Sequence, residues 1–318
     1  MIASAAGFQL CAHQPSAAQS MTEATAPSSS EHLLGSRHAY SDRGLDPDPP
    51  VRSIAGVKRR VRLRDIPRSL PVARVIAGRD LRAQYKQSFL GPLWLLVQPL
   101  GLVVAFGVVF GRVVRVDTGG VPYPLFVLVG LSVYSYFQAA LTTGTNAVVV
   151  NMSLIRRVAA PRIAFPTAST ASALPVLGVT FTVAFLLALG SGNLPFAHLV
   201  LLPICLAWLG LFTWSLVALL NSLTVRFRDV MYVLPFLLQM LLFLSPVAYR
   251  ADQASPSLSA VLELNPLAGI LELWRWTLLE GWRLDGTTVA IAVAWTAGLA
   301  VAAWRVFTRL EPTMADHV

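Results

Sequence analysis

The sequence predicts an all-α integral membrane protein with six transmembrane helices, an N-terminal interfacial helix and a re-entrant outer hairpin between helices five and six. Two observations support this fold class: the composition and a series of uncharged apolar runs. Of the 318 residues, 55% are hydrophobic and only 13% are charged, whereas soluble domains carry about 25% charged residues. With a mean hydropathy of +0.62, these values exclude a disordered chain and disfavour a soluble enzyme.

The six transmembrane helices are predicted from the apolar runs. A helix needs about 20 mostly apolar residues to cross a membrane. Six runs of suitable length contain no Asp, Glu, Lys or Arg, and they cover residues 91–111, 121–142, 163–189, 196–225, 231–249 and 287–304. We therefore assign residues 91–310 to a six-span membrane domain.

The segment before these runs divides into two parts. Residues 1–57 are rich in Ala, Ser, Pro and small polar residues, which predicts a disordered tail. Residues 58–90 form a basic collar, in which Arg79, Arg82 and Lys86 share one stripe of a predicted helix. Because the first apolar run follows at once, we interpret this as an interfacial helix at the membrane surface. A solvated basic face is the alternative.

The distribution of basic residues predicts the orientation. With the N-terminus inside, 20 of the 25 Lys and Arg residues lie on the cytoplasmic side and 5 lie outside. Short cytoplasmic segments are enriched in Lys and Arg. The chain is therefore expected in the inner (plasma) membrane with both termini in the cytoplasm, and residues 311–318 form a cytoplasmic tail.

The outer segment between the last two runs, residues 250–286, does not read as a simple loop. Its part from 258 to 279 is apolar, yet it contains Glu263, Glu272 and Arg275. It is too charged for a spanning helix and too apolar for a free loop. We therefore expect short helices that enter the outer leaflet partway and are buried against protein.

Several kinds of chemistry are excluded or disfavoured. A phosphate-binding loop requires Gly-Lys-[Ser/Thr], but the only lysines, Lys58 and Lys86, follow Val57 and Tyr85. The five histidines are scattered, which disfavours a metal site. The runs contain no carboxylates, which disfavours proton-driven transport. The chain is expected to hold no cofactor, and the energy for any uphill transport would come from another chain.

Short motifs along the chain resemble one family. Residues 82–100 read RAQYKQSFLGPLWLLVQPL, with Tyr85 in the basic helix and Trp94 in the first run. Residues 151–166 read NMSLIRRVAAPRIAFP, 226–229 read RFRD, and 237–249 read LLQMLLFLSPVAY. In the outer segment, Asn265-Pro266 precedes Arg275. In this order, the motifs resemble type-2 ABC permeases that export polysaccharides, including O-antigen and teichoic-acid exporters.

This resemblance implies a mechanism and a set of partners. The chain would form a homodimer with two separate ATP-binding subunits, which hold the ATP and magnesium. A lipid-linked glycan would pass from the inner leaflet to the outside, with membrane lipids around the spans and no nucleic acid involved. The chain itself would be no enzyme.

The loop after the second run is the expected contact with the ATP-binding subunit. Its apolar residues lie at near-helical spacing, so a short amphipathic helix could enter a groove on that subunit. With the 226–229 loop, the predicted coupling residues are Asn151, Leu154, Ile155, Arg156, Arg157, Val158, Arg228 and Asp229. Arg228 and Asp229 are expected to pair locally, with Asp229 capping the next span. A basic loop that only fixes topology is the alternative.

Aromatic residues suggest where a glycan would run. Trp94, Tyr134 and Phe137 are predicted to line the substrate channel, because aromatic faces stack on sugar rings. Ordinary helix packing is the alternative. Trp274, with Trp276 and Trp282, is expected in an interfacial aromatic belt. Glycan contact at the exit is the alternative.

Two other functions compete with glycan export. One is a drug or small-lipid efflux permease of the same architecture. The other is a membrane-embedded glycan-modifying enzyme, which is disfavoured because no cluster of polar catalytic residues is visible in the loops.

Overall fold

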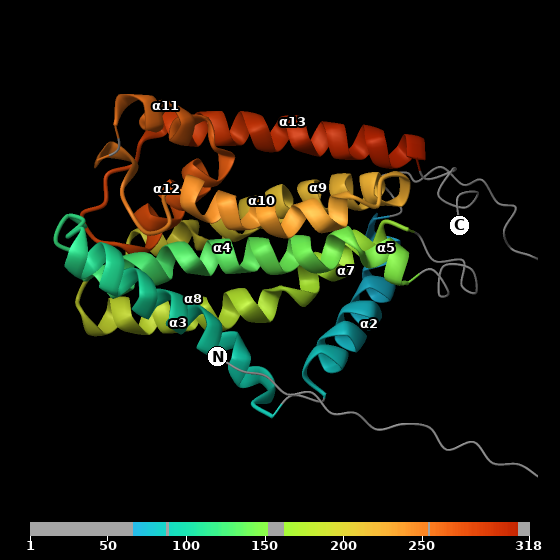
Figure 1. Cartoon of the computed structure of the whole chain (residues 1–318), viewed down its shortest axis with the longest axis horizontal. Coiled ribbons are helices and arrows are strands. Elements are labelled where there is room, and N and C mark those ends of the chain that lie inside the picture. Colours follow the sequence, from blue (N-terminus) through green and yellow to red (C-terminus); the bar gives the residue numbers. More distant parts are fainter. Residues whose placement is uncertain (1–65, 87–88, 152–161, 254, 311–318) are drawn as a thin grey trace, which may run out of the picture. The chain divides into compact units, whose positions relative to one another are not determined.

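Helices make up the regular structure of the computed structural model, which describes residues 66–86, 89–151, 162–253 and 255–310 (Figure 1). The chain divides into two units, residues 1–53 and 54–318, and the first lies outside the described residues. No strand occurs in the described part of the chain. The helices are α2 (Ile66–Tyr85), α3 (Trp94–Phe106), α4 (Tyr123–Thr145), α5 (Ala147–Val150), α7 (Ala164–Ser172), α8 (Leu174–Gly190), α9 (Leu202–Arg226), α10 (Val230–Leu244), α11 (Pro256–Leu264), α12 (Pro266–Leu278) and α13 (Gly286–Leu310).

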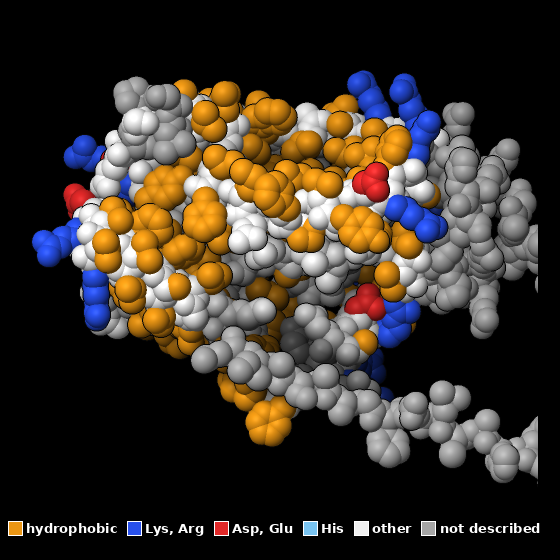
Figure 2. All heavy atoms as spheres, in the orientation of Figure 1, with side chains coloured by type: hydrophobic (Ala, Val, Ile, Leu, Met, Phe, Trp, Pro, Cys, Tyr) orange, Lys and Arg blue, Asp and Glu red, His pale blue; other side chains and the backbone are white. Residues whose placement is uncertain are grey.

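Five helical segments of the described chain are long and apolar enough to cross a membrane. They are Gly91–Val113, Tyr123–Thr145, Ala164–Gly190, His198–Arg226 and Gly286–Arg309. Each begins and ends within a few residues of a predicted run. Figure 2 shows apolar side chains along the middle of the visible face and Lys and Arg gathered toward its two ends. The prediction of an all-α integral membrane protein is confirmed.

The predicted fifth span, residues 231–249, differs from the structure. Its helix, α10, has 15 residues and stops at Leu244, so it is about 22 Å long against a hydrocarbon core of about 30 Å. The helix stops because Ser245 precedes Pro246, which disfavours helical geometry, and Ser245 is extended at φ −102° and ψ 141°. The turn that follows places Val247 and Ala248 in the core.

Helix α4 is the centre of the core. It is the most buried of the five segments, and it packs against α3, α7, α8, α9, α10 and α12. On its buried side, the Phe137 ring stacks on Phe212 with 5.7 Å between the centroids. The Tyr134 hydroxyl donates to the carbonyl of Leu238 on α10. These contacts hold α4 so that only a narrow face stays open.

Helix α2 is present where the interfacial helix is predicted, but its apolar face is covered by protein. Ala73, Ile76 and Ala77 form a small second core with residues of α5 and α7, among them Phe165 and Ala168. The basic side chains of this segment are exposed: Arg68, Arg74, Arg79, Arg82 and Lys86. The helix therefore presents a basic surface and no free apolar stripe.

The outer segment folds into α11 and α12. Helix α12 is almost entirely buried. It begins at the Asn265-Pro266 motif, where the Asn265 side chain accepts from the backbone N–H of Leu267 at 3.0 Å. The same side chain donates to the Leu244 carbonyl and the Ser245 hydroxyl, each at 3.0 Å. Asn265 therefore caps α12 and fastens it to the end of α10.

Candidate functional site

A groove of about 670 Å³ opens between α3, α4 and the junction of α7 and α8. Its polar wall is formed by side chains of four helices, α2, α3, α4 and α7. The lining includes Gln84, Trp94, Gln98, Ser135, Gln138, Thr142, Thr143 and Ser172. None of the lining residues is charged.

The open face of α4 is polar. Ser135, Gln138 and Thr142 follow at spacings of three and four residues, so they share one face of the helix. Gln138 and Thr142 are exposed and Ser135 is half-buried, while most of α4 is buried. Polar side chains on a spanning helix normally face protein or a water-filled cavity. This face of α4 is therefore unsuited to lipid and suited to a polar ligand or to water.

The polar side chains of the groove divide into two groups, those that are hydrogen-bonded within the chain and those that are not. The hydroxyls of Thr142 and Thr143 donate to backbone carbonyls of their own helix at 2.8 and 2.9 Å. The side-chain amides of Gln84, Gln98 and Gln138 make no hydrogen bond to any described residue. Each amide offers two donors and one acceptor oxygen. The groove therefore presents unused donors and acceptors side by side.

Helix α3 supplies the facing wall. Trp94, Gln98 and Leu102 lie four residues apart on one face of it, and all three line the groove. Trp94 was predicted as a channel residue, and 44% of its surface is exposed. An exposed indole beside an amide provides a flat apolar face and a nearby hydrogen-bonding group.

Tyr134 and Phe137 do not line this groove, in contrast to the prediction. Both are buried in the core, against Leu238 and Phe212. Phe137 and Ser135 are two residues apart and point to different faces of α4. The Tyr134 hydroxyl is directed toward α10 by its hydrogen bond to the Leu238 carbonyl. Their position is that of ordinary helix packing, which was the alternative to a channel lining.

The predicted coupling region is only partly described. Leu154, Ile155, Arg156, Arg157 and Val158 lie outside the described residues. Asn151 is buried, and its amide donates to the Ala147 carbonyl at 2.8 Å. Its oxygen accepts from Arg79 on α2, which also pairs with Asp80. Arg79 and Asn151, assigned separately from the sequence, therefore join α2 to the end of α5.

The predicted Arg228–Asp229 cap is not formed. Asp229 occupies the position before α10, but its side chain makes no capping hydrogen bond. Its backbone is helical, with φ −62° and ψ −24°, rather than extended as in a capping residue. Both side chains are exposed on the surface at this end of α10.

Trp274 is more deeply buried than predicted, and the neighbouring Arg275 is buried with it. Trp274, expected in an interfacial belt, is fully buried and donates to the Ser132 hydroxyl on α4 at 3.0 Å. Arg275 is 0% exposed and donates to the Val247 carbonyl at 2.8 Å. Its guanidinium lies 4.0 Å from the centroid of the Phe126 ring. Its remaining nitrogens, Nε and Nη1, have no partner in the described part of the chain.

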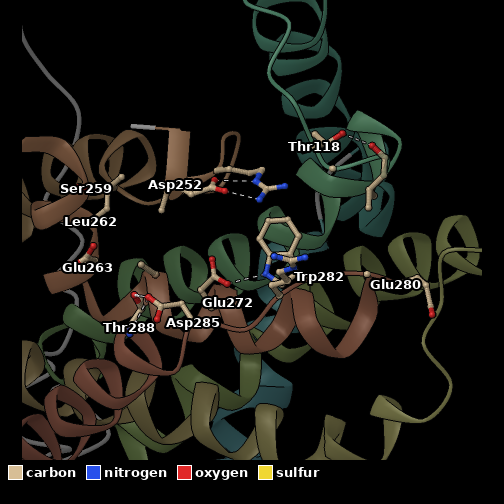
Figure 3. Close-up of a pocket in the computed structure, with 17 residues that line it drawn as sticks. Thr118, Asp252, Ser259, Leu262, Glu263, Glu272, Glu280, Trp282, Asp285 and Thr288 are labelled. Atoms are coloured by element: carbon tan, nitrogen blue, oxygen red, sulfur yellow. Dashed lines mark hydrogen bonds and ion pairs between the residues drawn. The ribbon is translucent and has the colours of Figure 1, made fainter. Parts of the chain in front are cut away.

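A second cavity, of about 470 Å³, lies at this outer end (Figure 3). Its carboxylates are largely engaged: Asp252 pairs with Arg250 at 2.6 Å, and Glu272 accepts from the Trp282 indole at 2.8 Å. The Arg250 hydrogen bond lowers the pKa of Asp252. The hydrogen bond from Thr288 at the start of α13 likewise lowers the pKa of Asp285. The carboxylates thus help to hold the outer loops together.

The fold and the groove together define a class of protein. A polar groove lies among apolar spanning helices, which is the arrangement of a membrane transport protein rather than of a receptor anchor. Within that class, the chain belongs to the ABC-2 type transporter family, whose model matches residues 72–279. The matched region includes α3, α4 and the outer helix α12.

Three curated relatives show which members of the family the chain is similar to. The chain is 26% identical over 245 residues to the O-antigen export system permease protein RfbA of Myxococcus xanthus, covering 76% of this chain and 94% of that protein. It is 25% identical over 214 residues to the protein of the same name from Klebsiella pneumoniae, covering 65% and 80%. It is 21% identical over 220 residues to the polysialic acid transport protein KpsM of Escherichia coli, covering 66% and 82%. The resemblance to polysaccharide-exporting permeases is confirmed.

Proposed function

We propose that this chain is the membrane-spanning permease subunit of an ATP-driven exporter. Its cargo would be a lipid-linked polysaccharide, such as O-antigen, teichoic acid or a similar cell-surface glycan, carried from the cytoplasmic side to the outside. The observation that carries the proposal is the uncharged polar groove of α3 and α4 with its unpartnered glutamines. Glutamine amides can bond sugar hydroxyls, and Trp94 can stack on a sugar ring. The names of the relatives support the same class of cargo.

The energy would come from a separate ATP-binding subunit that carries the ATP and magnesium. The family and the lack of a Gly-Lys-[Ser/Thr] motif in the sequence support this proposal. We assign the contact with that subunit to Asn151 and the loop after it, with Arg228 and Asp229 at the neighbouring end of α10. The hydrogen bond from Arg79 to Asn151 would pass movement of this loop to α2.

A homodimer would complete the pathway. Only Leu234 and Leu238 of α10 are buried, so most of this helix is open to a neighbour. The groove is also open on one side. A second copy packed by twofold symmetry would enclose a path between two such grooves. In this arrangement α10 and the turn after it form the fifth of six crossings, α12 is the re-entrant element, and both termini lie in the cytoplasm.

An export assay tests the proposal. The chain and its ATP-binding subunit would be produced in a bacterial strain whose own polysaccharide permease is deleted, and surface polysaccharide would be measured by immunoblot. We expect restored export, which is lost when the phosphate-binding lysine of the ATP-binding subunit is replaced. Gln98→Leu with Gln138→Leu should lower export at least tenfold at an unchanged membrane level of the protein.

The outcomes separate the competing functions. Normal export by the double variant would show that the groove is not the pathway. Absence of polysaccharide export together with increased resistance to lipophilic drugs would favour the efflux permease. Assembly with the ATP-binding subunit is checked in each case by co-purification.

A further inference from the structure

The groove differs from the rest of the polar surface in its charge. Its polar groups are amides, hydroxyls and one exposed indole, and among the described residues no Asp, Glu, Lys, Arg or His lines it. This holds although the sequence has a net charge of +9, with many basic residues on α2 close by in the chain. A pathway for acidic polymers would be expected to use such cations.

The pattern of hydrogen-bonding groups fits hydroxyls better than anions. The free amides of Gln84, Gln98 and Gln138 each carry both donors and an acceptor. A sugar hydroxyl also donates and accepts, so it can use both sides of an amide. A carboxylate or phosphate can only accept, and the amide oxygens would face it unpaired and with like partial charge.

The cost of removing a charged group from water also disfavours an acidic glycan in the groove. An anion that leaves water for a low-dielectric site is strongly penalised unless a cation or several donors compensate for it. The described residues that line the groove supply no cation. A neutral sugar unit exchanges its hydrogen bonds to water for bonds to the amides and carries no such penalty.

The outer cavity adds an independent observation. It is lined by five carboxylates, from Asp252, Glu263, Glu272, Glu280 and Asp285, and by two arginines, Arg250 and Arg283. This surplus of negative charge lies at the end of the chain's spans opposite to α2 (Figure 1). An acidic polymer would be repelled there, whereas a neutral one would not.

We propose that the groove selects glycans whose repeating units are uncharged, and that it rejects chains with carboxylates or phosphates along their length. Among the proposed cargoes this favours an uncharged O-antigen and excludes teichoic acid, whose backbone carries phosphates. This inference rests on the proposed function, because it names the substrate class of the same groove. It concerns the repeating sugar units and not the lipid carrier. Gln98 and Gln138 are the residues that determine the specificity.

A labelling experiment in the groove tests the selection. Thr143→Cys provides a reporter at the groove in a chain whose native cysteines are replaced, Cys11→Ser and Cys205→Ala. The full chain is assembled with its ATP-binding subunit in lipid nanodiscs, and the rate of maleimide labelling is measured. The probes are oligogalacturonate and the same oligomer after chemical reduction of its carboxyl groups, so they match in length and linkage.

We expect the neutral oligomer to slow labelling at a concentration at least tenfold lower than the acidic one. Gln98→Lys should lower the concentration of acidic oligomer required by at least tenfold, whereas Gln98→Asn should keep the neutral preference. Equal protection by both oligomers would overturn the selection and leave the export function standing. Protection by neither would remove the groove as a glycan site and so overturn both the inference and the proposed pathway.

Discussion

Several polar side chains of the outer element bond to other parts of the chain, whereas the glutamine amides of the groove do not. In the outer element, Asn265, Trp274 and Glu272 all bond to other segments of the chain. In the groove, the amides of Gln98 and Gln138 bond to nothing in the described chain. Buried polar groups are normally paired within the protein, whereas exposed ones on a spanning helix normally face a partner or water. The first region is therefore built to hold its own shape, and the second to contact something that the chain does not supply.

This comparison predicts that stability depends on the outer element and transport on the groove. The largest effect is expected at Gly269, where α12 packs on α13. A Cβ atom there would lie 2.5 Å from both the Thr288 carbonyl oxygen and the Ala292 Cβ atom. Gly269→Ala should therefore lower the free energy of unfolding by about 1–3 kcal/mol. Thermal unfolding in detergent, followed by tryptophan fluorescence, measures the change.

Gly298 on α13 provides the control for this substitution. No atom lies within 4 Å of a Cβ at this position. Gly298→Ala should be neutral or stabilising by up to about 1 kcal/mol, because Ala favours helix more than Gly does. Equal destabilisation by the two variants would contradict the close packing of α12 on α13.

A smaller loss is expected when the Asn265 cap is removed. Asn265→Ala deletes the cap of α12 and both bonds to the end of α10, and a lost cap typically costs about 0.5–2 kcal/mol. Asn265→Asp keeps the acceptor for the Leu267 N–H but loses the two donated bonds. Its stability should lie between those of the wild type and Asn265→Ala. The same unfolding assay ranks the three proteins. An unchanged unfolding midpoint for Asn265→Ala would contradict the stabilising role of the Asn265 cap.

A substitution in the groove should lower export without lowering stability. Gln138→Leu removes an unpartnered amide from an exposed face of a spanning helix, so the free energy of unfolding should stay the same or rise. Export should fall about tenfold for each 1.4 kcal/mol of lost interaction with the glycan. Tyr134→Phe, which loses a bond in the core, is the comparison. It should lose stability by about 1 kcal/mol and change export less than Gln138→Leu does.

The two regions also differ in how far the sequence predicts them. The length of the apolar runs and their lack of charge correctly predicted five spans, because both properties can be judged from each run of the sequence alone. The stop of α10 at Ser245 was missed although the signal, Pro246, is visible in the sequence. Trp274 and Tyr134 were assigned to a belt and to a channel because they are aromatic, but their neighbours decide their position. Gln98 and Gln138 were missed because a single glutamine in an apolar run becomes informative only when the open face of its helix is known.

The smallest effect is expected from the exposed ion pair of the outer element. Arg250 lowers the pKa of Asp252 in the folded protein below the unfolded value, which is about 3.9. The pair therefore contributes stability above that unfolded pKa, and the contribution is lost as the pH falls through the folded pKa. Because 60% of the Asp252 side chain is exposed, the contribution is about 1 kcal/mol or less.

Unfolding of the wild type and of Asp252→Asn would be compared at pH 7 and pH 3. The wild type should be slightly more stable at pH 7, and the difference should shrink at pH 3 and in high salt. A difference that persists at pH 3 would mean that the hydrogen bonds of this side chain, rather than its charge, hold the outer loop. The outer element would then resemble the groove in relying on uncharged polar contacts.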